Sequence, residues 1–71
     1  MRTAGRIAVV QEERFRLITD DGQGLLLTLS KDAAASPEDL VRYYRDATHV
    51  EVDYSGEPNI ESGVASQVRQ A

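Results

Sequence analysis

Three consecutive segments in the first half of the chain alternate between apolar and polar residues with a period of two. This period is typical of β-strands that bury one face. The segments are residues 3–10, 14–19 and 25–29, and polar or glycine-containing stretches separate them. The pattern predicts a three-stranded antiparallel meander. A helix over residues 7–18 is the alternative, but its apolar stripe would carry Arg14 in the middle.

A single register would place the apolar residues of all three strands on one buried face, because residues opposite each other in an antiparallel pair share a face. The first pairing sets Val10 opposite Arg14 across the loop Gln11-Glu12-Glu13, and the second sets Thr19 opposite Leu25. The buried face would then consist of Ile7, Val9, Phe15, Leu17, Leu25, Leu27 and Leu29.

The two turns of this meander differ in their chemistry. Asp21-Gly22 and Gly24 supply residues that adopt positive φ readily, as the second turn requires. The first turn, Gln11-Glu12-Glu13, has neither glycine nor asparagine. We therefore expect one of its residues to adopt a left-handed conformation at a small cost.

A helix start follows the meander. Ser36 can cap the helix, Pro37 suits its first position, and Glu38 and Asp39 lie where the helix dipole favours negative charge. We expect the helix to cover residues 37–46.

The apolar stripe of this helix would be formed by Leu40, Tyr43, Tyr44 and Ala47. Adjacent helix residues point about 100° apart, so only one of the two tyrosines can occupy the centre of the core. We expect Tyr44 to pack inward with Leu40, and Tyr43 to lie at the margin with its hydroxyl in water.

Two further strands are predicted after the helix. Residues 49–54 alternate, with Val50, Val52 and Tyr54 inward and with Glu51, Asp53 and a surface His49 outward. Residues 63–69 form the last strand, with Val64 and Val68, and Gly63 is a candidate bulge. Gln70 and Ala71 are expected to fray. The core would be completed by Leu40, Tyr44, Val50, Val52 and Val64 or Val68.

The order of elements, three strands, a helix and two strands, resembles that of the oligonucleotide/oligosaccharide-binding (OB) barrel. The resemblance covers nearly all of residues 1–71 as a single domain, and it implies a mainly β, five-stranded barrel. It also implies that the fourth strand lies beside the first, which would set Glu51 and Asp53 near Arg6. An SH3-like barrel is the alternative, although it more often has only a 3₁₀ turn before its last strands.

Parts of the chain also resemble small bacterial barrel proteins of unknown function. The resemblance lies in Gly5-Arg6-Ile7, in Glu13-Arg14-Phe15-Arg16-Leu17, and in the stretch from Asp21-Gly22 to Leu25-Leu26-Leu27. These segments form the predicted meander, and no diagnostic motif accompanies them.

Composition narrows the classes of function. The 71 residues include no Cys and one His, which excludes disulfides, thiol chemistry and His-rich metal centres. The net charge of −4 argues against a duplex-DNA binder. No apolar run is long enough to cross a membrane. We expect a soluble, cytoplasmic protein that is not an enzyme and holds no metal or cofactor, because no catalytic or phosphate-binding motif is found.

The outward face of the meander is the candidate site. It consists of Arg6, Arg14, Arg16, Ile18, Leu26 and Thr28, and the expected register sets Ile18 opposite Leu26. Arginine beside exposed apolar residues is enriched in protein interfaces. The sequence therefore favours a small binding or adaptor module that contacts a protein partner.

A weak single-stranded nucleic-acid binder using Arg6, Arg14 and Arg16 is the alternative function. It lacks an aromatic stacking platform, since Phe15 faces inward. A face that is merely solvated is a third interpretation, and the oligomeric state stays open.

Overall fold

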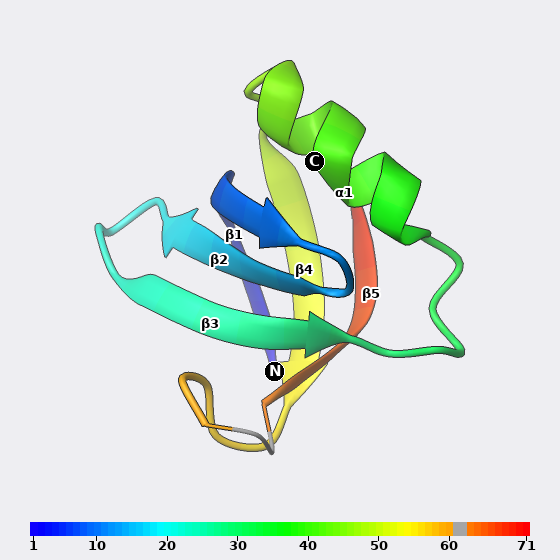
Figure 1. The fold of residues 1–71 in the computed structure, drawn as a ribbon. Coiled ribbons are helices and arrows are strands. Elements are labelled where there is room, and N and C mark those ends of the chain that lie inside the picture. The colour runs from blue at the N-terminus through cyan, green and yellow to red at the C-terminus, as the bar shows by residue number, and fades with distance from the viewer. Residues whose placement is uncertain (61–62) are drawn as a thin grey trace.

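Five strands close into a barrel, and one helix is inserted between the third and fourth strands (Figure 1). The structure, a computed structural model, describes residues 1–60 and 63–71. Its elements are β1 (Arg2–Gln11), β2 (Arg14–Thr19), β3 (Gly24–Leu29), α1 (Pro37–Arg45), β4 (Val50–Ser55) and β5 (Val64–Gln70). The strand order is β1-β2-β3-β5-β4, and only β3 and β5 are parallel. The OB-like barrel is therefore confirmed, and the nine-residue helix distinguishes it from the SH3-like alternative.

The first hairpin contains a β-bulge that the sequence pattern did not reveal. Ile7 lies opposite Leu17 as expected, but the register shifts at Ala8, so that Val10 rather than Val9 lies opposite Phe15. The turn is shorter than expected, because Gln11 pairs with Arg14. Val10 packs against the core, and Val9 is 54% exposed, so the prediction of Val9 as a core residue was wrong. Glu12 has φ of 57°, which confirms the expected left-handed residue.

The second hairpin is offset by two residues from the expected register. Thr19 pairs with Gln23 through the bond from Thr19 N–H to Gln23 O (2.8 Å), and Gln23 N–H donates to the Thr19 hydroxyl (2.9 Å). Phe15 therefore lies opposite Leu27, and Leu25 moves to the margin of the core. An offset of two leaves every side chain on its predicted face. Gly22 has φ of 91°, as expected, but Gly24 does not adopt positive φ.

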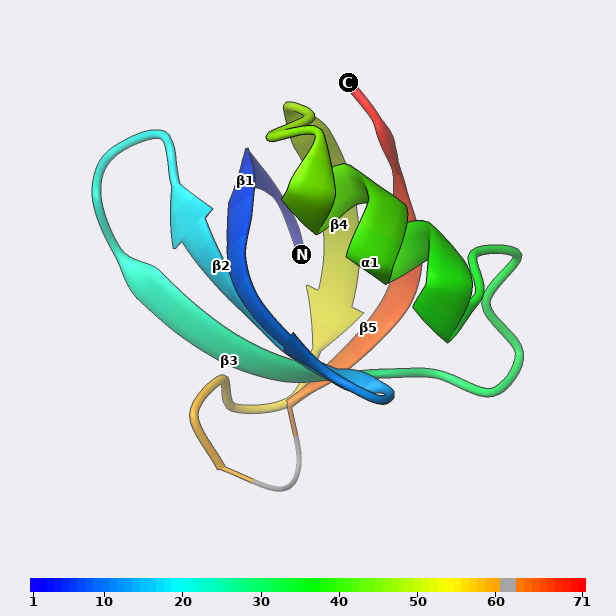
Figure 2. The ribbon, with the colours of Figure 1, turned by 45° about the horizontal axis from the view of Figure 1, so that its top comes forward.

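Helix α1 begins where the sequence indicates, but it packs Tyr43 against the core in place of the expected Tyr44. Ser36 and Asp39 form a capping box, in which the Ser36 hydroxyl accepts from Asp39 N–H and the Asp39 carboxylate accepts from Ser36 N–H. Leu40 is fully buried and Tyr43 packs against the core, whereas Tyr44 is 49% exposed. The expected roles of the two tyrosines were thus reversed. Helix α1 packs against β1, and in Figure 2 it crosses in front of β4 and β5.

Strand β1 is shared by two neighbours, and Gly5 lies at the point where they meet. Gly5 pairs with Thr19 of β2 and with Val50 of β4. A Cβ at Gly5 would overlap the carbonyl oxygen of Ile18 and lie 2.8 Å from the Ile18 carbonyl carbon and from the Thr19 Cα. Strand β1 can approach the backbone of β2 this closely only where a side chain is missing.

The barrel closes where β3 runs beside β5. Thr28 and Leu29 pair with Val64 and Ala65, and Thr28 N–H also donates to Gly63 O at 3.0 Å. The bulge of this region lies within β5, where Asp53 pairs with Gln67 but Tyr54 pairs with Ala65, so the predicted bulge at Gly63 was misplaced.

The core fills the barrel with residues from every strand and one helix residue. Its fully buried members are Ile7, Phe15, Leu17, Leu27, Leu29, Leu40, Val50, Val52, Ala65 and Val68. Of the two valines offered for the last strand, Val68 is the buried one, and Ala65 was not predicted. Although residues 70 and 71 were expected to fray, β5 continues to Gln70, and Ala71 N–H donates to His49 O at 2.9 Å.

Candidate functional site

The outward surface of β1, β2 and β3 places the six candidate residues on neighbouring strands. We call this surface the meander face, and the strand pairing arranges it in three rows: Gln11, Arg14 and Thr28; Val9, Arg16 and Leu26; Arg6, Ile18 and Gly24. Ile18 therefore lies opposite Gly24 and not opposite Leu26, which corrects the expected pairing. Arg16 lies between the two apolar residues of its row. None of these side chains is acidic.

Exposure separates the apolar members of the meander face. Val9 and Ile18 are exposed, Ile18 at 39%, and Leu26 is half-buried. Val9 is a member that the sequence reasoning missed, because the bulge at Ala8 turned it outward. The adjacent pair Val9-Val10 was the available signal, since either valine can face the core once one residue is inserted.

The loop between β4 and β5 borders the meander face along β3. Asn59 N–H donates to Leu26 O at 2.9 Å, and Leu26 N–H donates to the Asn59 side-chain oxygen at 2.8 Å. In Figure 1 this loop lies beside the first half of β3. Asn59 has φ of 73°, a conformation that asparagine tolerates better than most residues. The neighbouring Ile60 is exposed and adds an apolar side chain at this border.

The three arginines of the meander face differ in what holds them. Arg6 Nε donates to Ala47 O at 3.1 Å, which ties β1 to the end of the helix. In the part of the chain that the structure describes, Arg14 and Arg16 have neither an ion pair nor a side-chain hydrogen bond. Both side chains are exposed. The guanidinium groups available to a ligand are therefore chiefly those of β2.

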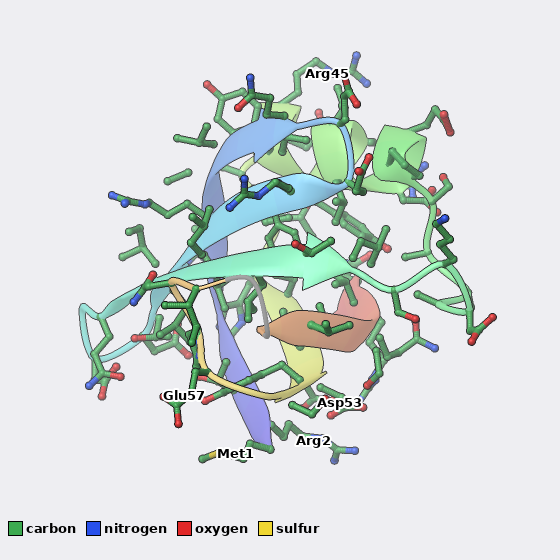
Figure 3. The ribbon with its side chains drawn as sticks, turned by 60° about the horizontal axis from the view of Figure 1, so that its bottom comes forward. Met1, Arg2, Arg45, Asp53 and Glu57 are labelled. Carbon is green, nitrogen blue, oxygen red and sulfur yellow. The ribbon has the colours of Figure 1, made fainter. Side chains whose placement is uncertain are left out.

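On the outward surface of β4 and β5, in contrast to the meander face, the arginines are paired with carboxylates. Arg2 Nε donates to Asp53 at 2.7 Å, and Arg69 donates to Asp53 at 3.1 Å and also to Glu51. Figure 3 shows Arg2 beside Asp53 at one end of the molecule, with Arg45 at the opposite end of the view. The carboxylates expected near Arg6 are thus paired with Arg2 and Arg69, because β1 pairs with β4 only through Arg2–Gly5.

This ion-pair cluster predicts a stability that depends on acid pH. Hydrogen bonds from Arg2 and then Arg69 lower the pKa of Asp53 below its ordinary value of 3.8. A carboxyl whose pKa is lower in the folded state stabilises the fold above the ordinary value, and loses this contribution as the pH falls through the folded pKa. Urea unfolding of Asp53→Asn should therefore show a smaller loss of stability below about pH 4 than the wild type.

Asp32→Asn is the control for this measurement, because it removes an exposed carboxylate for which the structure gives no ion pair. Equal pH dependence for the Asp53 and Asp32 variants would contradict the assigned role of the cluster.

His49 connects two loops of the barrel. Its Nε2 lies 3.0 and 3.1 Å from the two carboxylate oxygens of Asp20, in the turn between β2 and β3. Asp20 lies 29 positions before His49 in the chain, so the fold brings this pair together. The imidazole is partly exposed, in agreement with the expected surface position.

Within residues 1–60 and 63–71, no pocket is found, and no group of three or more His, Asp or Glu side chains is placed to hold a metal ion. No helix in this part of the chain is long and apolar enough to span a membrane. Comparison with protein-family models and with curated proteins finds no match. The meander face is therefore the candidate functional site of the described residues.

Proposed function

We propose that the chain is a non-enzymatic binding module that contacts a protein partner through the meander face. The observation that carries this proposal is Arg16, whose guanidinium has no ion-pair partner among the described residues and is flanked by Val9 and Leu26 on the neighbouring strands. Arginine among apolar anchors is over-represented in binding hot spots, because it combines a planar hydrogen-bonding group with apolar contact area. A face on which the described residues form no pocket also suits a macromolecule better than a small molecule.

Single-stranded nucleic acid is the second candidate, favoured by Arg6, Arg14 and Arg16 on one face of an OB-like barrel. Binding of this kind uses aromatic side chains on which the bases stack. The meander face has none, since Phe15 points into the core with 1% of its surface exposed. The protein partner is therefore the function that the geometry supports better.

A pull-down with a charge-reversed face tests the proposal. Arg16→Glu combined with Leu26→Asp places two carboxylates in the central row, so proteins captured by the wild type should be lost. Arg45→Glu with Val41→Asp makes the same type of change on the exposed side of α1 and should retain them. Circular dichroism verifies that both variants are folded. Capture of the same proteins by the meander-face variant would contradict the proposal.

A further inference from the structure

The two outward sheet surfaces of the barrel differ in how their positive charges are compensated. Arg2 and Arg69 are neutralised by Glu51 and Asp53 on β4, although the pairs lie at the surface. Arg14 and Arg16 have no such partner in the described residues, in a chain that carries 12 acidic and 8 basic residues. Carboxylates thus outnumber cations in the sequence, yet no carboxylate of the described residues is placed on the meander face.

The spacing of the outward side chains along β2 indicates which ligand would fit the meander face. Arg14, Arg16 and Ile18 are alternate residues of one strand, so their side chains stand about 6.6 Å apart along it. An extended peptide presents every second side chain with the same repeat. Two carboxylates at positions i and i+2 would meet the two guanidinium groups, and an apolar residue at i+4 would meet Ile18.

The apolar neighbours of Arg16 favour an ion pair between its guanidinium and a carboxylate of the peptide over a guanidinium that is only solvated. Its cross-strand neighbours, Val9 and Leu26, lie about 4.8 Å away on either side, at the ordinary strand spacing. A peptide that covers these apolar residues excludes water from the guanidinium. Bidentate arginine–carboxylate bonds are strengthened in such surroundings.

We infer that the partner of the meander face is an extended protein segment in which two acidic residues alternate with others and an apolar residue follows at the next alternate position. This inference rests on the proposed function, and it names the chemistry of the partner. The third guanidinium, that of Arg6, is held by Ala47 O and borders Ile18. The acidic pair should therefore bind at Arg14 and Arg16, and the apolar residue beside Arg6.

A titration followed by NMR amide shifts tests the inference with synthetic peptides. The probe peptide contains Glu-Thr-Glu-Thr-Leu, the neutral control Gln-Thr-Gln-Thr-Leu, and the permuted control Glu-Glu-Thr-Thr-Leu. The probe should shift amides of β1, β2 and β3, and both controls should bind about tenfold more weakly. The double variant Arg14→Gln with Arg16→Gln should weaken the probe by a similar factor. Lys31→Gln with Arg45→Gln removes the same charge elsewhere and should change it less than about twofold.

The outcomes separate this inference from the proposed function. If no acidic peptide binds, or if the permuted peptide binds equally well, the inference is overturned. The pull-down can still support a protein partner of other chemistry in that case. If oligodeoxythymidylate causes stronger shifts on the same strands than the probe, and these fade steeply with salt, the partner is nucleic acid and both proposals fail.

Discussion

Replacing Gly5 by alanine is expected to cost at least about 3 kcal/mol of folding free energy. A methyl group at this position would overlap the Ile18 carbonyl, which belongs to the β2 backbone and cannot rotate away as a side chain can. Relief requires β1 to separate from β2, just where β1 also pairs with β4. A domain of 71 residues has a total stability of roughly 4–10 kcal/mol, so most of it would be lost.

Thermal unfolding followed by circular dichroism measures this loss, and the melting temperature should fall by at least about 12 °C. Gly24→Ala is the matched control, because an added Cβ there meets only the Ile18 Cδ1, at 3.8 Å. That variant should lie within about 0.5 kcal/mol of the wild type. Similar stability for the two glycine variants would disprove the close approach at Gly5.

Truncation of Leu40 to alanine is expected to destabilise the barrel by about 3 kcal/mol. Leu40 is the one residue of α1 in the fully buried core, and none of its surface is exposed. Leucine and alanine differ little in helix propensity, so the loss would come from the cavity and from apolar contacts rather than from the helix itself. Urea unfolding should show a lower midpoint with an unchanged slope.

Val41→Ala serves as the control, since Val41 is adjacent in sequence and 47% exposed. Because alanine has the higher helix propensity, this variant should be as stable as the wild type or slightly more stable. If the Leu40 variant lost no more than the Val41 variant, α1 would not be packed against the barrel as described.

The pattern of alternating residues predicted which face each strand of the barrel buries, and it did so with few exceptions. Phe15, Leu17 and Leu27 lie in the core although the second hairpin is offset by two residues. The reason is that an offset of two preserves the inward or outward orientation of every side chain. The helix start at Ser36 was also predictable from the sequence, because its capping box involves only residues one turn apart.

Part of the candidate site was not predictable from the pattern. Val9 joined the meander face because a bulge at Ala8 reversed the orientation of the residues that follow it. Pairing partners also depend on register. Leu26 was expected opposite Ile18, but it lies opposite Arg16. The burial of Tyr43 in place of Tyr44 depends on how α1 is rotated on the barrel, which their adjacent positions do not determine.

The amino-acid sequence alone determined the number and type of the elements and most of the core, because side-chain periodicity and helix capping act over a few residues. It also placed Arg6, Arg14 and Arg16 on one outward surface. Only the tertiary structure decided which arginines are neutralised. Strand β4 brings Glu51 and Asp53 to Arg2 and Arg69, which are far apart along the chain, whereas Arg14 and Arg16 have no ion-pair partner among residues 1–60 and 63–71. Ion pairing depends on distances across the closed barrel, and strand order and register set those distances.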